Sequence, residues 1–204
     1  MKIRFRKFWI YITVRNVFIS SLLIFGLIGL TASVAISIEK TNLIKSPDTK
    51  LVCDLNPVYS CAKIIDSAQS KTLGLPNELL GIMMFSPLIT VGVALISGAS
   101  VNKWFWRAFI FGMLGFMLSV ARLFYISVYQ ISALCILCSA VWFSGWAITT
   151  TGFAWLYDEK HIPKTKITNY VRRNIIGFWL LLLMVAIFIV LNHFWYYYGT
   201  YFGA

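Results

Sequence analysis

Charged side chains are scarce in this sequence, and their scarcity excludes a soluble domain with a wet surface. Only 12% of the 204 residues are charged, whereas 59% are hydrophobic and 17% are aromatic. Soluble domains carry about twice that share of charge. Internal repeats and low-complexity segments are also missing, which excludes a repeat array and leaves one bundle as the expected organisation.

The hydrophobic residues are gathered in five long runs. A helix needs roughly 20 apolar residues to cross a bilayer core of about 30 Å. Because lipid offers the backbone no hydrogen-bond partners, each run is predicted to be a transmembrane helix. The sequence therefore predicts an all-α integral membrane protein. The five runs lie near Val17–Ile38, Leu79–Ile96, Phe105–Tyr129, Ala133–Leu156 and Ile175–Tyr197.

The first run has one alternative interpretation, a cleaved signal peptide. Ser33-Val34-Ala35 loosely fits a small-x-small cleavage site after a basic leader. The apolar stretch is longer than the usual signal-peptide core of about 7–15 residues, which favours a permanent span.

The net charge of +11 is distributed unevenly along the chain. The N-terminal segment and the connectors after the second and fourth runs together carry twelve positive and two negative side chains. The loop after the first run, about residues 39–77, balances five lysines against five acidic residues when Glu78 is included. By the positive-inside rule the basic segments are cytoplasmic and the loop is external. Membrane orientation thus accounts for the basic charge without a nucleic-acid partner.

Several shorter features predict local structure. Ala62–Ala68 has its apolar residues on one face and is predicted to be a short helix lying flat at the membrane interface. The short reversal around Tyr129–Ser132 makes the third and fourth spans antiparallel neighbours. Small residues on helical spacings are expected to let helices approach closely, as packing in lipid requires: Gly26, Gly29, Gly112 and Gly115.

Four cysteines carry the chemistry that the sequence indicates, and all lie on or near the predicted external side. Cys53 and Cys61 bracket a seven-residue segment of the loop, whereas Cys135 and Cys138 form a Cys-Ile-Leu-Cys motif at the start of the fourth span. An even number of cysteines in an oxidising compartment indicates disulfide chemistry. Cysteines three residues apart share a helix face and are close enough to bridge.

The C-x-x-C pair is expected to lie across the boundary between water and lipid. Ser132 is a plausible N-cap, which would place Cys135 in the first helical turn, where free N–H groups and the helix dipole favour a thiolate. Cys138 would lie roughly 4.5 Å deeper. Cys135 is therefore predicted to face water and the loop, and Cys138 the lipid-soluble phase. That arrangement suits a relay from an aqueous reductant to a hydrophobic oxidant.

Three other interpretations of the cysteines stay open. Cys53 and Cys61 could form a structural disulfide, although a structural bridge within one helical turn, as in the second pair, is unusual. A zinc site fits poorly, because a C-x7-C pair with an intramembrane C-x2-C pair does not match zinc-ribbon spacing. Inert buried thiols are disfavoured by the paired spacing. His161 and His193 stand alone on opposite sides and are interpreted as incidental.

Three stretches occur in an informative order: residues 53–61 (Cys-Asp-Leu-Asn-Pro-Val-Tyr-Ser-Cys), 74–81 (Gly-Leu-Pro-Asn-Glu-Leu-Leu-Gly) and 135–138 (Cys-Ile-Leu-Cys). In order and spacing they resemble the vitamin K epoxide reductase family, and its bacterial members more than its animal ones. The resemblance covers about Val17–Tyr157 and implies a four-helix bundle around a quinone, capped by the cysteine loop. We therefore divide the chain into a basic cytoplasmic N-terminus, the four-helix domain, a basic cytoplasmic connector, and a fifth span with an external C-terminus: residues 1–16, 17–157, 158–174 and 175–204.

The resemblance implies a role for each cysteine. Cys138 would react with the quinone, either ubiquinone or menaquinone, and Cys135 would be its partner, which exchanges with Cys61 in the loop. Cys53 would take electrons from a thioredoxin-fold (DsbA-like) protein and pass them to Cys61. Many bacterial members carry a fused thioredoxin-like domain, whereas this chain continues into a fifth span. The thiol donor is therefore expected to be a separate protein.

Three further residues are candidates near the quinone. Asn77 would hydrogen-bond a quinone carbonyl, or alternatively cap the second span. Trp142 stands where animal members have a tyrosine, and its N–H can donate a hydrogen bond; the alternative is an aromatic side chain that faces lipid or core. Arg122 is a charge inside a span, which could meet the quinone, a lipid headgroup or Tyr125, although snorkelling to the interface is favoured.

As a whole the sequence predicts a thiol:quinone oxidoreductase of the bacterial inner membrane that supports disulfide formation in exported proteins. One alternative is reduction of vitamin K quinone or its epoxide. Another, from a different class, is a non-enzymatic metal- or haem-handling membrane protein. A DsbB-type quinone reductase is disfavoured, because in that family the C-x-x-C pair precedes the second pair, whereas here it follows.

The charge distribution yields a test of orientation. A reporter enzyme that works only outside the cytoplasm should be active when fused within residues 39–77 or after Ala204, and inactive when fused within residues 158–174. Reporter activity is measured in intact bacterial cells at matched expression. A reporter that stays inactive at both external sites would overturn the orientation.

Overall fold

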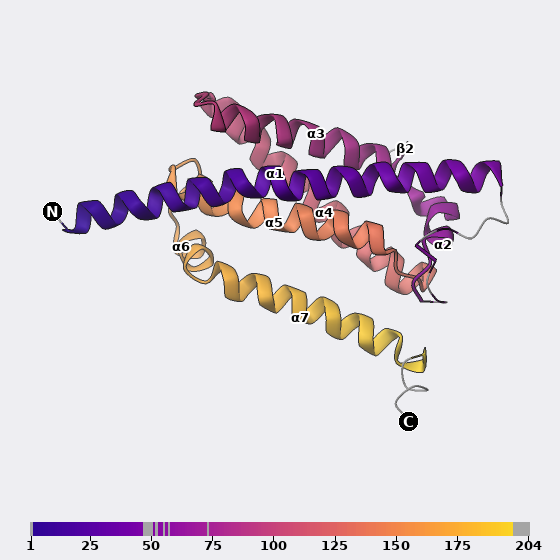
Figure 1. Ribbon diagram of the computed structural model, residues 1–204. Helices are drawn as coiled ribbons and strands as arrows, with labels where there is room; N and C mark the ends of the chain where they lie inside the picture. Colours follow the sequence, from indigo (N-terminus) through magenta and orange to yellow (C-terminus); the bar gives the residue numbers. More distant parts are fainter. Residues whose placement is uncertain are drawn as a thin grey trace.

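The computed structural model describes residues 2–46, 51, 53–54, 56, 58–72 and 74–197, and within them the protein is almost entirely helical (Figure 1). The predicted external C-terminus, residues 198–204, lies outside the described residues. The elements in chain order are α1 (Lys2–Lys45), α2 (Cys61–Asp66), η1 (Ala68–Ser70), β1 (Lys71–Thr72), β2 (Leu75–Pro76), α3 (Asn77–Ile96), α4 (Lys103–Tyr125), η2 (Ile126–Ile131), α5 (Ile136–Asp158), α6 (Lys166–Arg173) and α7 (Ile175–His193).

Five helical segments in the described part of the chain are long and apolar enough to cross a membrane. They correspond one to one with the five hydrophobic runs, so the predicted all-α membrane bundle with an additional fifth helix is confirmed. The third span is longer than expected, because the π-helical segment η2 extends α4 to Ile131. The spans are Val14–Lys45, Asn77–Ile96, Lys103–Ile131, Ile136–Asp158 and Ile175–His193.

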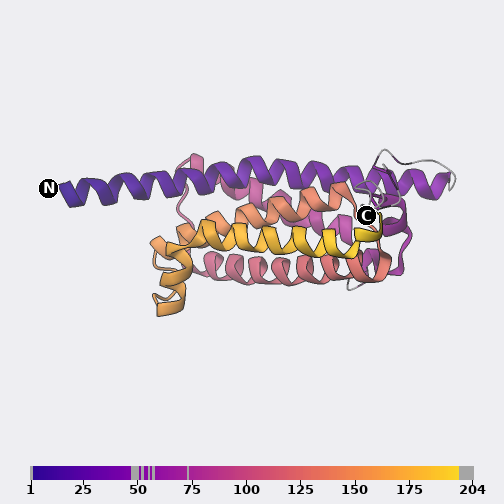
Figure 2. The same cartoon turned by 90° about the horizontal axis from the view of Figure 1, so that it is seen from below.

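Helix α1 is the axis of the bundle. It packs along α3 and along α5, runs the whole length of the molecule and extends past the other helices at its N-terminal end (Figures 1 and 2). Far from the cysteines, Phe18 of α1 stacks on Trp155 of α5 with 5.1 Å between ring centroids, and Trp106 of α4 meets the Trp155 ring at 4.5 Å. His161 lies beside this aromatic core, 6.1 Å from the Trp106 ring.

Only one of the two predicted glycine pairs lies at a helix contact. A Cβ atom on Gly26 would come within 2.8 Å of Ile89, and one on Gly29 would overlap the ring of Phe85, so both glycines let α1 and α3 approach closely. Gly112 and Gly115 would each place a Cβ atom in open space, with nothing within 4 Å. Their predicted packing role is wrong, because no side chain of a neighbouring helix in the described part of the chain comes within contact distance of either position.

The short loop helix differs from the prediction in its bounds and in its surroundings. It begins at Cys61, where Ser60 is the N-cap, and ends at Asp66, because Ser67 is extended and its hydroxyl donates to the carbonyl of Ile64. Its buried residues are Cys61 and Ile65, which pack with α1 and α5 residues around the cysteines. The apolar face of α2 therefore covers protein at the end of the bundle.

The fifth long helix contributes to the bundle mainly at its C-terminal end. None of the residues in α7 itself is buried. Phe194, just beyond α7, is fully buried against Val58 of the loop and Leu134 of the turn before α5. The neighbouring His193 lies 3.5 Å from the Ser132 hydroxyl. The end of α7 thus supports the segments that carry the cysteines.

The glycine contacts yield a matched pair of stability predictions. Gly29→Ala should lower the free energy of unfolding by about 1–3 kcal/mol, because the added methyl group overlaps the Phe85 ring and forces α1 and α3 apart. Gly115→Ala adds the same methyl group to an exposed helix position and should change stability by no more than about 1 kcal/mol, in the favourable direction. Thermal unfolding of both variants in detergent measures the difference. Equal losses from the two substitutions would contradict the packing described for α1 and α3.

Candidate active site

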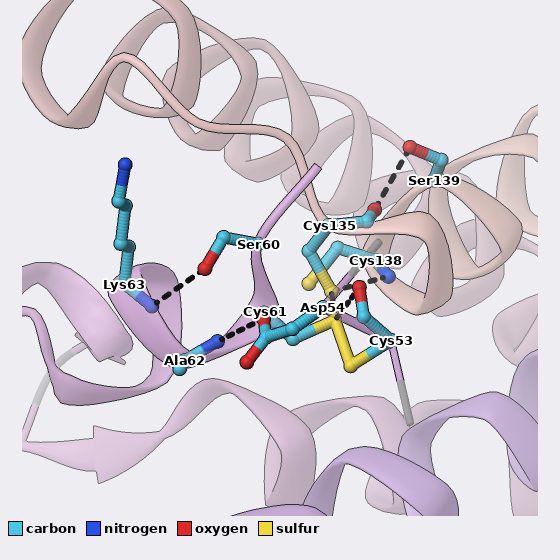
Figure 3. Close-up of a disulfide and its surroundings, with 9 residues drawn as sticks. All are labelled: Cys53, Asp54, Ser60, Cys61, Ala62, Lys63, Cys135, Cys138 and Ser139. Atoms are coloured by element: carbon cyan, nitrogen blue, oxygen red, sulfur yellow. Dashed lines mark hydrogen bonds between the residues drawn. A yellow bond between two sulfur atoms is a disulfide. The ribbon is translucent and has the colours of Figure 1, made fainter. Parts of the chain in front are cut away.

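The four cysteines are connected in series by a disulfide, a contact between sulfur atoms and a hydrogen bond (Figure 3). Cys53 and Cys61 are joined by a disulfide, with 5.7 Å between their Cα atoms. The Sγ atom of Cys61 lies 3.1 Å from the Sγ atom of Cys135. Cys135 in turn accepts a hydrogen bond on its Sγ from the backbone N–H of Cys138, at 3.3 Å. The loop pair and the helix pair therefore meet through Cys61 and Cys135.

A short backbone pairing brings the two pairs together. The N–H of Ser60 donates to the carbonyl of Leu134 at 3.0 Å, and the N–H of Leu134 donates to the carbonyl of Val58 at 2.7 Å. These bonds form a parallel bridge between Tyr59 and Leu134. Cys61 comes two residues after Tyr59 and Cys135 one residue after Leu134, so the bridge holds the two cysteines close together.

The loop side of this pairing is held by local side-chain caps. The Asn56 carboxamide oxygen accepts hydrogen bonds from the N–H groups of Val58 and Tyr59, at 3.0 and 2.8 Å. Such turns are typical of asparagine. The carboxylate of Asp54 accepts from the N–H of Ala62 at 3.1 Å, in the first turn of α2. Residues of the Cys53–Cys61 stretch thus shape the loop as well as supplying its sulfurs.

The predicted N-cap of the fourth span is wrong. Ser132 ends η2 in the left-handed conformation, with φ of 53°, and residues 133 and 134 are extended toward the loop pairing. Helix α5 therefore starts only at Ile136, and Cys135 itself is the N-cap. Cys135 is also fully buried against Cys61, so the expectation that it faces water is wrong as well. The expectation that it faces the loop agrees with the geometry.

The cap position favours the thiolate form of Cys135. A hydrogen bond from the Cys138 side chain lowers the pKa of the Cys135 thiol, and the backbone N–H groups of Cys138 and Leu137 lower it further. Burial and the charge of Asp54 oppose this effect, but the net direction is downward. A thiolate in contact with a neighbouring disulfide is the reacting species of thiol–disulfide exchange.

Cys138 opens onto an apolar pocket between the helices, which we call the Cys138 pocket. Its wall is formed by Ile36 of α1, Ile65 of α2, Ile126 of η2 and Trp142 of α5, with Asn77 and Glu78 at the start of α3. The cavity itself measures about 90 Å³ and opens to the outside. A largely apolar hollow with a few polar groups is typical of a small-molecule site.

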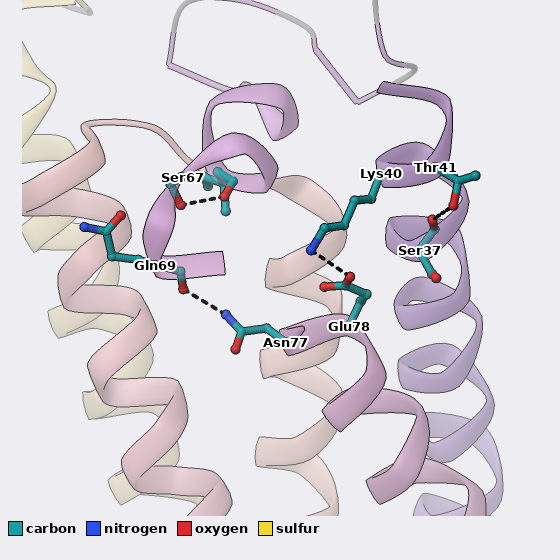
Figure 4. A network of polar contacts seen from close by, with 8 residues as sticks. Ser37, Lys40, Thr41, Ser67, Gln69, Asn77 and Glu78 are labelled. Carbon is teal, nitrogen blue, oxygen red and sulfur yellow. Dashed lines mark hydrogen bonds and ion pairs between the residues drawn. The ribbon is translucent and has the colours of Figure 1, made fainter. Parts of the chain in front are cut away.

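Asn77 points into the Cys138 pocket with unused hydrogen-bonding capacity (Figure 4). Its amide nitrogen donates to the carbonyl of Gln69 at 3.1 Å, which fixes the orientation of the amide. Its carbonyl oxygen is buried without a partner among the described residues, and one N–H stays available. The alternative role as N-cap is wrong, because Pro76 occupies the cap position and Asn77 is the first residue of α3.

The other two candidates differ in position. Trp142 lines the Cys138 pocket and packs edge-on against Phe124, with 6.1 Å between ring centroids. Arg122 is exposed on the last turn of α4 and is not among the residues that line the pocket. The geometry therefore brings Cys138, Asn77 and Trp142 to one pocket and leaves Arg122 outside it.

The motif order, the bundle and the series of four cysteines agree with a comparison against family models. The model of the vitamin K epoxide reductase family matches residues 20–153. The chain belongs to this family. No curated protein matches the chain in a search of such proteins. The matched region contains α3, α4, most of α1 and α5 and all four cysteines, whereas α7 lies beyond it.

In this family member one pair of residues near the site was missed by the sequence analysis. Glu78 is buried at the start of α3, and its carboxylate lies 3.0 Å from the ammonium group of Lys40 at the end of α1. The available signal was an acidic residue directly after Asn77, in the first turn of an otherwise uncharged span.

The cap geometry predicts how Cys135 titrates. In the reduced protein Cys135 should be alkylated by iodoacetamide at a lower pH than an ordinary cysteine, because its lowered pKa keeps the thiolate present as the pH falls. Cys138→Ala removes the largest pKa-lowering contact and should shift the alkylation midpoint of Cys135 to higher pH. Peptide mass spectrometry over a pH series measures it.

The matched control is Ser139→Ala, since the Ser139 hydroxyl donates to the Cys135 carbonyl and not to its sulfur. This variant should leave the midpoint in place. An unchanged midpoint in Cys138→Ala would show that the contact with Cys138 does not set the reactivity of Cys135.

Proposed function

We propose that this protein is a membrane thiol:quinone oxidoreductase. In this proposal it takes electrons from an extracytoplasmic thioredoxin-fold protein, transfers them to a quinone and so supports disulfide formation in exported proteins. The supporting observation is the position of Cys135. Its sulfur contacts the loop disulfide through Cys61, while its motif partner Cys138 lines an apolar pocket.

The first transfer occurs at the loop. A thiolate of the donor protein attacks the Cys53 sulfur, the Cys53–Cys61 bond breaks, and Cys61 leaves as a thiolate. The second thiolate of the donor then releases Cys53, so the donor is oxidised and the loop is left as a dithiol. Cys53 is suited to this role because the sulfur of Cys61 contacts Cys135, which leaves Cys53 as the loop cysteine for the donor.

The second transfer occurs between the pairs. The Cys61 thiolate attacks Cys135 of a Cys135–Cys138 disulfide, Cys138 leaves as a thiolate, and Cys53 closes the loop disulfide again. The products are an oxidised loop and a reduced Cys135/Cys138 pair. That is the combination of a Cys53–Cys61 disulfide and two free helix cysteines found in the structure.

The lining of the Cys138 pocket supports a quinone as the final acceptor. A quinone ring has apolar faces and two carbonyl groups that accept hydrogen bonds. The apolar wall would hold the faces, and the free N–H of Asn77 would hold one carbonyl. When bound, the quinone supplies the acceptor for two electrons and two protons. Trp142 would add an aromatic wall beside Cys138.

The segment charges support a bacterial inner-membrane location with the cysteines outside. The loop that bears Cys53 and Cys61 is balanced in charge, whereas the connectors at the other ends of the helices are basic. In this orientation, the active site would face the compartment in which exported proteins form disulfides.

The proposed donor should be trapped by removing one loop cysteine. In Cys61→Ala, Cys53 lacks the thiol that resolves its bond to the donor, so a mixed disulfide with a separate thioredoxin-fold protein should accumulate. Non-reducing gels of bacterial membranes, followed by mass spectrometry of the adduct, measure it. Cys53→Ala is the control and should trap none.

The wild-type chain should also restore disulfide formation in a bacterium that lacks its own disulfide-generating membrane enzyme. Failure of both experiments would contradict the proposed function.

The two helix cysteines should behave differently when replaced. Cys138→Ala leaves Cys135 in contact with Cys61 and should accumulate a Cys61–Cys135 disulfide, measured by peptide mapping without reduction. Cys135→Ala leaves Cys138 alone in its pocket. In membranes that contain quinone it should give a new visible absorbance band, as expected of a thiolate held against the quinone. A band in Cys138→Ala instead would reverse the two roles.

A further inference from the structure

The carboxyl group of Glu78 lies in the wall of the Cys138 pocket. Among the described residues that line the pocket, only Glu78 and Cys138 carry ionisable side chains. Glu78 retains 8% exposure, and its carboxylate forms the 3.0 Å ion pair with Lys40 (Figure 4). A buried carboxylate beside an apolar pocket is costly to maintain. Its position therefore calls for an explanation.

Lys40 connects this carboxyl group to a second hollow. Lys40 lines a wide, open groove between the end of α1 and α2, which we call the α1–α2 groove. Ile65, Ser67 and Ser70 line both the groove and the Cys138 pocket, so they form a shared wall. The Lys40–Glu78 pair joins the two hollows: Glu78 lines the pocket, and the Lys40 side chain lines the groove while its ammonium nitrogen is buried beside the Glu78 carboxylate.

The chemistry of the site requires protons as well as electrons. Oxidation of the Cys135/Cys138 dithiol to a disulfide releases two electrons and two protons, and reduction of a quinone to a hydroquinone consumes both. Thiolates transfer electrons only after their protons have left to water or to another base. Protons must therefore reach the quinone oxygens inside a pocket whose wall is otherwise mainly apolar.

We propose that the Lys40–Glu78 ion pair is the proton relay of the Cys138 pocket, an inference that rests on the proposed function. The ammonium group of Lys40 gives a proton to the Glu78 carboxylate, and the neutral Glu78 carboxyl group gives that proton to a quinone oxygen and becomes a carboxylate again. Lys40 then takes a new proton from the α1–α2 groove, which its side chain lines. Two such cycles deliver two protons, and the two protons from the thiols go to water, so atoms and charge balance.

A purely structural role is the competing explanation. The pair links α1 to α3, and an acidic residue in the first turn of a helix is favoured by the helix dipole. A tie of this kind depends on matched charges. A relay depends on a group that binds and releases a proton. Substitutions that keep the charges matched separate the two.

The first measurement is quinone reduction by the full-length protein in nanodiscs that contain a quinone, with a reduced thioredoxin-fold protein as donor. Glu78→Gln keeps the shape of the side chain but cannot carry the proton. It should slow hydroquinone formation by roughly 10²-fold, the range expected for loss of a general acid. Transfer between the two cysteine pairs, followed by mass spectrometry after rapid quenching, should keep its wild-type rate.

Two further variants complete this set. The double variant Lys40→Gln/Glu78→Gln has no charge at either position, so neither side chain is left as an unpaired charge beside the Cys138 pocket. It should remain as slow as Glu78→Gln, whereas a structural tie predicts recovery of the rate. Glu39→Gln, the matched control on α1, removes an acidic residue that does not line the pocket and should leave the rate unchanged.

The second measurement is independent of activity. In infrared spectra of the protein without quinone, Lys40→Met should produce the carbonyl band of a protonated carboxyl group at neutral pH. That band should shift promptly in D2O, because the proton exchanges with water in the groove. It should be absent from Lys40→Met/Glu78→Gln.

The outcomes separate this inference from the proposed function. If the wild-type protein does not reduce the quinone at all, the proposed function fails. If the wild type is active and Glu78→Gln matches it, or the double variant recovers the rate, the relay alone is refuted. Failure of the infrared band to appear, or to shift in D2O, would also refute the relay.

Discussion

The backbone pairing between Tyr59 and Leu134 is the interaction on which the site depends. Its two hydrogen bonds hold the cysteine loop against the turn between α4 and α5. Since Cys61 and Cys135 follow the paired residues, the register of this pairing decides which sulfurs meet. In extended segments a shift by one residue turns each side chain to the opposite face. The 3.1 Å contact between the two sulfurs therefore requires this register.

The pairing also explains the unusual helix ends around it. Leu134 must be extended to pair, so the preceding helix ends through a π-helical segment and a left-handed Ser132, and α5 starts at Ile136. The hydroxyl of Ser127 and the N–H of Ala133 close this turn from within. Phe194, just after α7, packs against Leu134 and Val58 on the outer side of this turn. The C-terminal end of the fifth span therefore helps to hold the turn in place.

Two routes to the Cys138 pocket follow from this arrangement. The sulfurs approach it from the loop, through Cys61 and Cys135, while the Lys40–Glu78 pair reaches it from the α1–α2 groove. In the proposed function, electrons would use the first route and protons the second. Separate routes suit a pocket with an apolar wall, because a quinone needs both electrons and protons but binds best where water is excluded.

The sequence by itself determined the five spans, the all-α class and the family, because run length and motif order are properties of the chain alone. It also identified the four cysteines, Asn77 and Trp142 as candidate residues of the site. It missed the start of α5, the bounds of α2, the exposed face with Gly112 and the partner of Glu78. Those features were decided by the tertiary structure, since each depends on contacts between distant segments. Whether Cys135 caps a helix depends on the loop that pairs beside it, and whether Glu78 has an ion-pair partner depends on the position of Lys40 in another helix.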